Sequence, residues 1–236
     1  YLAIDSVQSL IEAQVRRDPD RIATISGEAQ LSYRELEERS NQLGHYLHEQ
    51  GVELGSRVGI CLDRGVDLLV AILGVLKAGG AYVPMDTGYP RERLAYMLSD
   101  SNAPVLITQE CMVEELPETR SQVICIDRDW STIGCQPTVK VPVTVTPESL
   151  LYVIYTSGST GQPKGAGVYH RNEVNLLQWY ADEYDLSESD RTLIISSIGF
   201  DLTQKNLFAL LTCGGTVVFP EMEQFDPQQV ANEIEQ

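Results

Sequence analysis

The sequence predicts an α/β fold made of repeated βα units with largely parallel sheets. Short apolar runs of strand length alternate along the chain with longer segments whose apolar residues recur at helical spacing. Such alternation is typical of parallel strands joined by right-handed helical crossovers. The chain has 236 residues, of which 43% are hydrophobic and 22% charged, so it can form one large domain or two small ones with a real core.

Two amphipathic helices are expected at the start of the chain. Apolar residues from position 7 to 15 recur at helical spacing, and Asp18, Pro19 and Asp20 then stop the first helix. Ser32 and Glu35 have the spacing of a capping box and begin the second helix, which Gly51 ends.

Strand-length runs and helical stripes alternate through the rest of the chain. The predicted strands cover residues 57–62, 81–84, 104–108, 122–126, 151–155, 191–196 and 216–219. The predicted helices cover residues 66–76, 90–98, 172–184, 202–211 and the segment from 227 onward. Residues 127–149 are rich in Thr, Pro and Val without a clear period, which predicts an irregular connection carrying short edge strands.

The charge balance argues against nucleic acid as a partner. The 17 Lys and Arg residues face 34 Asp and Glu residues, for a formal charge of −17. A surface of this sign repels a phosphate backbone and offers no basic stripe. It still allows a single nucleotide to bind, because one loop of backbone N–H groups and one Lys can override the overall field.

Cysteine usage and hydropathy indicate a cytoplasmic protein. The five cysteines are scattered, and no C-x-x-C pair or Cys/His cluster has the spacing of a zinc site, so we expect reduced thiols and no protein-bound metal. Residues 1–17 lack the basic and apolar regions of a signal peptide. No apolar run approaches the length of a membrane span, so no membrane partner is expected.

A glycine- and hydroxyl-rich loop follows the predicted strand 151–155. Its glycines let the backbone approach a phosphate closely, its hydroxyls donate to phosphate oxygens, and Lys164 supplies charge. It is not a Walker A loop, since Pro163 and Gly165 oppose the helix that this motif opens. The alternative is a flexible Ser/Gly linker. As phosphate-binding residues the loop offers Thr156, Ser157, Gly158, Ser159, Thr160, Gly161 and Lys164.

Residues 152–165 resemble the signature loop of the adenylate-forming superfamily, and the chain resembles the amino-acid adenylation domains of nonribosomal peptide synthetases. Residues 31–36, 76–86, 170–172 and 200–203 agree with that pattern in order and spacing. The resemblance implies that an amino-acid carboxylate attacks the α-phosphorus of Mg²⁺-ATP, which gives aminoacyl-AMP and pyrophosphate. The aminoacyl group would then pass to the phosphopantetheine thiol of a carrier protein. Thr156 and Lys164 would be the catalytic residues of this loop, stabilising charge on the leaving group.

The resemblance also implies a substrate site at Phe200, Asp201, Leu202 and Lys205. In similar domains the Asp pairs with the α-ammonium of the substrate, which favours an α-amino acid over an aryl or fatty acid. From its position alone, Asp201 could equally cap the helix that follows. Lys205 lies on the same helix face and suggests an acidic or polar substrate, Glu-like or Asp-like, unless it turns outward.

Other features leave alternatives open. His170 can be structural or face the site, and we expect Trp179, Tyr180 and Tyr184 to pack on a helix rather than stack on a base. The motifs that would complete the site and a C-terminal lid domain do not appear, so we expect residues 1–236 to be the N-terminal portion of the adenylation core, with subdomains 1–149 and 150–236, and to be inactive alone. The remaining hypotheses are an acyl- or aryl-acid CoA ligase-like enzyme and a non-catalytic piece that docks neighbouring synthetase domains.

Overall fold

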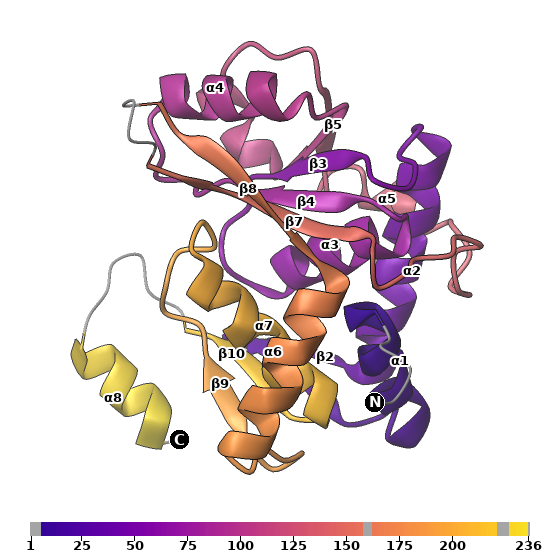
Figure 1. The fold of residues 1–236 in the computed structure, drawn as a ribbon, viewed down its shortest axis with the longest axis vertical. Helices are drawn as coiled ribbons and strands as arrows, with labels where there is room; N and C mark the ends of the chain where they lie inside the picture. Colours follow the sequence, from indigo (N-terminus) through magenta and orange to yellow (C-terminus); the bar gives the residue numbers. More distant parts are fainter. Residues whose placement is uncertain (1–5, 158–161, 221–226, 236) are drawn as a thin grey trace.

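The computed structural model describes residues 6–157, 162–220 and 227–235. Within these residues the strands form two sheets, one of six strands ordered β6-β5-β3-β4-β7-β8 and one of four ordered β2-β1-β10-β9. Figure 1 shows the larger sheet in the upper half of the molecule and the smaller one in the lower half. The predicted α/β class with largely parallel sheets is confirmed.

The six-stranded sheet is parallel except at one edge. Its strands are β3 (Arg57–Ile60), β4 (Ala81–Pro84), β5 (Val105–Thr108), β6 (Gln122–Cys125), β7 (Leu150–Thr156) and β8 (Lys164–Tyr169). The last strand, β8, runs antiparallel to β7, with Thr156 opposite Lys164. The two strands therefore form a hairpin, and the predicted phosphate loop joins them at its end.

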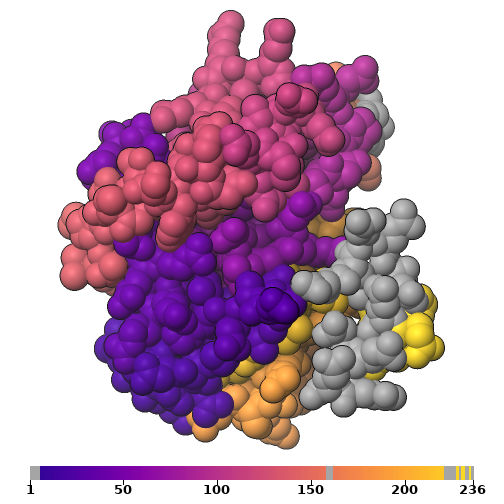
Figure 2. All heavy atoms as spheres, turned by 180° about the vertical axis from the view of Figure 1, so that it is seen from behind, coloured from indigo at the N-terminus to yellow at the C-terminus, as the bar shows by residue number. Residues whose placement is uncertain are grey.

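The four-stranded sheet joins the two ends of the chain. Its strands are β1 (Ile22–Ser26), β2 (Ala29–Ser32), β9 (Arg191–Leu193) and β10 (Thr216–Phe219). Parallel pairing places Thr24 of β1 beside Val217 of β10. Figure 2 shows the result from behind, with the indigo N-terminal part next to the orange segment. Each sheet contains strands from both sides of residue 149, because β1 pairs with β10 in one sheet and β4 pairs with β7 in the other.

Helices pack on and between these sheets. They are α1 (Val7–Arg17), α2 (Tyr33–Glu49), α3 (Val66–Lys77), α4 (Arg91–Ser101), α5 (Trp130–Ile133), α6 (His170–Glu183), α7 (Asp201–Cys213) and α8 (Pro227–Glu235), with a 3₁₀ helix η1 (Glu110–Glu115). Helix α3 contacts strands of both sheets and is buried from Leu68 onward, so it forms the centre of the core. The predicted capping box is confirmed: Ser32 N–H donates to Glu35 Oε2 at 2.7 Å, and Glu35 N–H donates to Ser32 Oγ at 3.2 Å.

Two strands were missed, and one local prediction was wrong. The strands β1 and β2 were not predicted. The segment 127–149 holds the short helix α5 and turns, and its described residues form no edge strand before β7 begins at Leu150. Its apolar residues are used for packing instead: Val141 is buried, with a methyl group against Gly44 of α2. Within the described residues, no helix has both the length and the apolar character needed to cross a membrane.

Candidate active site

A cavity of about 680 Å³ lies where the β7–β8 hairpin meets the loop that precedes α7. Thr156 and Ser157 from the end of β7 line it together with Phe200 and Asp201. The structure thus brings two stretches that are far apart in the sequence to one site. Of the substrate residues predicted from the sequence, Leu202 and Lys205 are not among the described residues that line this cavity.

The hairpin holds both ends of the phosphate loop. Thr156 and Lys164 are paired across β7 and β8, and the side chains of Thr156, Ser157 and Lys164 are exposed. Tyr96 of α4 anchors the returning strand, since its hydroxyl donates to the carbonyl of Pro163 at 3.0 Å. Four predicted loop residues, Gly158, Ser159, Thr160 and Gly161, lie outside the described residues.

Asp201 is the first residue of α7, and its carboxylate also borders the cavity. Its Oδ1 accepts a hydrogen bond from the Leu202 N–H at 2.7 Å. A negative charge at a helix N-terminus is stabilised by the helix dipole, so Asp201 supports the start of α7. The residue before it, Phe200, makes no side-chain capping bond. Asp201 thus lies both at the start of α7 and in the cavity wall, and its pairing with a substrate α-ammonium stays a prediction.

Buried polar side chains of α7 hold the loop before Asp201, and sequence reasoning missed them. Gln204 Nε2 donates to the carbonyls of Ile198 at 2.6 Å and Phe200 at 3.2 Å. Tyr82 of β4 donates its hydroxyl hydrogen to Gln204 Oε1 at 2.5 Å. Thr203 Oγ1 donates to a further loop carbonyl at 2.7 Å. The first turn of α7 therefore fixes the backbone that presents Phe200 and Asp201.

A second missed residue lies behind the cavity wall. Glu173 of α6 is buried, and the hydroxyl of Tyr152, a wall residue, donates to its Oε2 at 3.1 Å. Burial, with a smaller effect of the charge on Asp201, raises the pKa of Glu173 to about 7, while the hydrogen bond from Tyr152 and the charge on Lys205 act in the opposite direction. A signal was present in the sequence, because Glu173 interrupts the apolar stripe that includes Val174 and Leu177.

Lys205 and His170 occupy positions beside the cavity rather than in its wall. Lys205 Nζ lies 3.6 Å from the centre of the Tyr180 ring, a cation–π contact between α7 and α6. His170 Nδ1 accepts the Val7 N–H at 3.2 Å, and burial lowers the pKa of His170 to about 4. This contact ties α6 to α1, which is a structural role. Trp179 of α6 and Tyr184, which follows the last residue of α6, are exposed.

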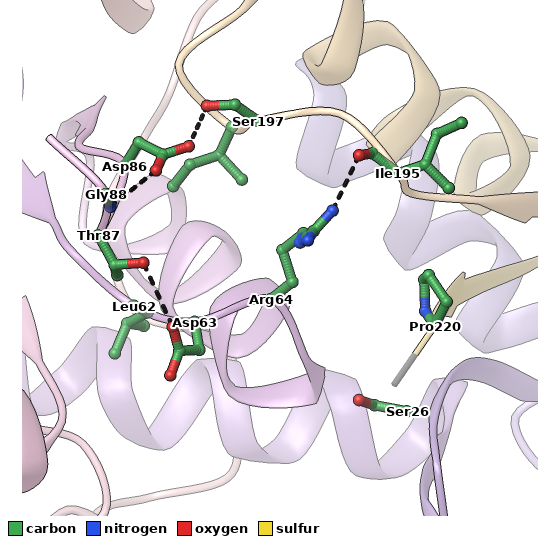
Figure 3. A pocket seen from close by; sticks show the side chains of 11 residues that line it. Ser26, Leu62, Asp63, Arg64, Asp86, Thr87, Gly88, Ile195, Ser197 and Pro220 are labelled. Carbon is green, nitrogen blue, oxygen red and sulfur yellow. Dashed lines mark hydrogen bonds between the residues drawn. The ribbon is translucent and has the colours of Figure 1, made fainter. Parts of the chain in front are cut away.

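A neighbouring cavity of about 780 Å³ shares a wall with the first. Asp86, Gly88 and Ser197 line both, and Figure 3 shows the Asp86 carboxylate accepting bonds from the Gly88 N–H and the Ser197 hydroxyl. On its far side, Arg64 Nη1 donates to the carbonyl of Ile195 at 2.9 Å. This larger cavity contains none of the predicted site residues that the structure describes, so the candidate site is the smaller one.

In the part of the chain that the structure describes, no group of three or more His, Cys, Asp or Glu side chains could hold a metal ion.

Comparison with known proteins gives a consistent family. The model of the family described as AMP-binding enzyme matches residues 11–236. One of the subunits of linear gramicidin synthase from Brevibacillus parabrevis is 46% identical over 215 residues, which are 91% of this chain and 4% of that protein. The chain therefore spans a small part of the length of this curated relative.

Solved structures of synthetases share the fold. The nonribosomal peptide synthetase FmoA3, in its AMPPNP-bound form, superposes with a TM-score of 0.90 at 33% identity, covering 98% of this chain and 24% of that one. NpsA-ThdA from Klebsiella oxytoca, an artificially fused adenylation and carrier-protein di-domain, gives a TM-score of 0.89 at 25% identity, covering 100% of this chain and 46% of that one.

Proposed function

The chain belongs to the AMP-binding enzyme family, with nonribosomal peptide synthetases as its relatives, and we propose that it forms part of an adenylation domain that activates an α-amino acid with ATP. The observation that carries this proposal is the shared cavity. Hydroxyl groups suited to phosphate and a carboxylate suited to an ammonium line the same space of about 680 Å³.

The reaction needs the attacking carboxylate and the leaving pyrophosphate to be held in line at the α-phosphorus of ATP. A carboxylate oxygen of the amino acid attacks the α-phosphorus of ATP, the bond from that phosphorus to the bridging oxygen breaks, and pyrophosphate leaves with the electron pair. Thr156, Ser157 and Lys164 are proposed to hold the phosphates, because hydroxyl and ammonium donors stabilise the charge that grows on the leaving group. Positioning and electrostatics then supply most of the catalysis, with no covalent enzyme intermediate.

Asp201 is proposed to bind the α-ammonium of the substrate. Its exposed carboxylate borders the cavity, and a charge-assisted hydrogen bond to an ammonium is stronger than a neutral one. An aryl or fatty acid would leave this carboxylate without a partner, so the residue favours an α-amino acid. Lys205, one turn further along α7, favours a polar or acidic side chain on that amino acid.

The remaining partners follow from the proposed reaction. Mg²⁺ would enter with ATP, since phosphate oxygens and water supply most ligands of this ion in nucleotide sites. The acceptor would be the phosphopantetheine thiol of a peptidyl carrier protein, the kind of domain to which the adenylation domain is fused in NpsA-ThdA. Neighbouring synthetase domains would be the other partners.

Acid-dependent exchange of pyrophosphate into ATP tests this function. The native polypeptide that contains this chain is assayed with the common α-amino acids, aryl acids and fatty acids. We expect exchange with one class of α-amino acid. Lys164→Ala should reduce it by about 10²- to 10³-fold, the usual loss when a donor to a developing anion is removed. Lys140→Ala, whose ammonium instead meets Glu12 at 2.7 Å, is the matched control and should retain exchange.

The other outcomes separate the alternatives. Exchange with aryl or fatty acids but with no α-amino acid would assign the protein to the acyl- or aryl-acid ligases and contradict the role of Asp201. An absence of exchange with every acid would favour a non-catalytic role in docking neighbouring domains.

A further inference from the structure

A buried carboxylate with an unused oxygen lies between α6 and the cavity wall. Glu173 is 2% exposed, and Tyr152 occupies its Oε2 at 3.1 Å. Its Oε1 has no hydrogen-bond partner within the described part of the chain. Buried polar atoms are almost always paired, and an unpaired one costs about 1–3 kcal/mol. A group kept at this cost points to a role beyond packing.

Packing alone would place an apolar residue at this position. Glu173 lies on the inner face of α6 together with the buried residues Val174 and Leu177. Leucine or isoleucine would fill such a position with no unpaired atom. The surrounding fold therefore does not require a carboxylate here.

The charged groups around Glu173 belong to the substrate side of the molecule. Lys205 and Asp201 of α7 both act on its ionisation, the first favouring and the second opposing the charged form. Lys205 reaches the α6–α7 seam, since its Nζ lies 3.6 Å from the ring of Tyr180, two turns beyond Glu173 on α6. Tyr152 links Glu173 to the cavity wall. One positive and one negative charge therefore stand together behind the pocket.

We propose that Glu173 is a specificity-determining residue of the amino-acid pocket, which together with Lys205 selects an uncharged side chain that both donates and accepts hydrogen bonds, such as a carboxamide, over an acidic one. This inference rests on the proposed function and narrows its substrate class. Lys205 alone would attract a carboxylate, but Glu173 repels one, and in a poorly solvated seam such a charge acts over several ångströms. A carboxamide offers an oxygen to Lys205 and an N–H to the carboxylate side, so both charges are met.

The test compares acids with their amides. Values of kcat/KM for pyrophosphate exchange are measured for Gln, Glu, Asn and Asp, with the remaining amino acids as a screen. The assay is run at pH 8, where a carboxyl of pKa about 7 is ionised. The native polypeptide should prefer the amide over the matching acid. Glu173→Gln, which keeps the shape and the bond from Tyr152, should move the acid-to-amide ratio toward the acid by about tenfold or more.

A matched control separates this role from a general effect of losing a buried charge. Glu12 of α1 is also buried with an Oε1 that has no partner in the described residues, but it faces Lys140 in a different part of the molecule. Glu12→Gln should leave the acid-to-amide ratio unchanged. A ratio that also stays unchanged in Glu173→Gln, or a native preference for acidic or aliphatic amino acids, would overturn the inference while leaving the proposed function standing. Exchange with no α-amino acid would overturn both.

Discussion

Two buried ionisable side chains in this molecule differ in how completely they are hydrogen-bonded. Lys77 of α3 meets Glu37 Oε1 at 2.6 Å and Asn41 Oδ1 at 2.8 Å, and Asn41 donates back to Glu37 at 3.1 Å. Glu173 of α6 has one hydrogen bond and one oxygen without a partner among the described residues. The three side chains of the first network bond to one another, whereas the carboxylate of Glu173 is only half paired. The difference predicts that the closed network contributes more to stability than the half-paired carboxylate.

Breaking the closed network should have the largest effect on stability. Lys77→Met leaves the Glu37 carboxylate without its cation, and removing one partner of a buried pair costs about 3–5 kcal/mol. The free energy of unfolding in urea should fall by this amount, while the choice of amino acid in pyrophosphate exchange by the remaining folded protein stays unchanged. A loss below about 1 kcal/mol, the value of an exposed pair, would show that the network contributes little to stability.

The burial of Glu173 should make the stability of the protein depend on pH. Glu173 has its pKa raised from 4.5 to about 7, so the folded protein binds more protons between these values, and the contribution of Glu173 to stability falls as pH rises through them. His170, three residues earlier, has its pKa lowered from 6.5 to about 4, so its contribution falls as pH drops from 6.5 to 4. The two effects oppose each other, each with a size of about 3 kcal/mol.

Differences between variants and the native protein at each pH separate the two groups. The unfolding free energy of the native protein minus that of Glu173→Gln should fall as pH rises from 4.5 to 7. The same difference for His170→Gln should instead rise from pH 4 to 6.5. Two flat differences would mean that neither group has the buried environment described here.

A smaller effect on stability is expected from the hydrogen bonds that hold the loop before Asp201. Tyr82→Phe removes the hydroxyl that donates to Gln204, and the lost hydrogen bond should cost about 1–2 kcal/mol in unfolding free energy. Because Gln204 also holds the carbonyls of Ile198 and Phe200, the KM for the amino acid should rise while the KM for ATP stays constant. Equal changes in both KM values would indicate a general loosening of the fold rather than a local one.

The smallest effect should come from an ion pair on the surface. Arg34 and Asp20 lie 3.0 Å apart with side chains 51% and 82% exposed. Arg34→Ala should lower the unfolding free energy by less than about 1 kcal/mol and leave exchange unchanged, because water and salt screen such a pair. If Arg34→Ala lowered the unfolding free energy as much as Lys77→Met, burial would not explain why the Lys77 network contributes more to stability than the exposed pair.

Local patterns in the sequence predicted most of the fold. The alternation of strands and helices and the capping box at Ser32 and Glu35 depend on neighbouring residues, and the structure confirms them. The strands β1 and β2 were missed, and β1 pairs with β10, which comes from the other end of the chain, while β2 pairs only with β1. The Val- and Thr-rich stretch 127–149 suggested edge strands, but its described residues form none, and Val141 packs against Gly44 of α2 instead.

The site was predictable in part for the same reason. Thr156, Ser157 and Asp201 were found through the resemblance of short motifs, and the structure places them around one cavity. The roles of Gln204 and Glu173 depend on which helix and strand pack beside them. No local sequence pattern predicts this packing, although a Glu within an apolar stripe indicates a residue worth considering for the site.

One measurement addresses the substrate site directly. Values of kcat/KM for pyrophosphate exchange are compared between the preferred α-amino acid and the same acid without its amino group, in the native protein and in Asp201→Asn. If Asp201 binds the α-ammonium, the native protein should prefer the amino acid, and the variant should lose about 10- to 100-fold of that preference, the value of a charge-assisted hydrogen bond. An undiminished preference in Asp201→Asn would contradict this assignment and limit Asp201 to starting α7.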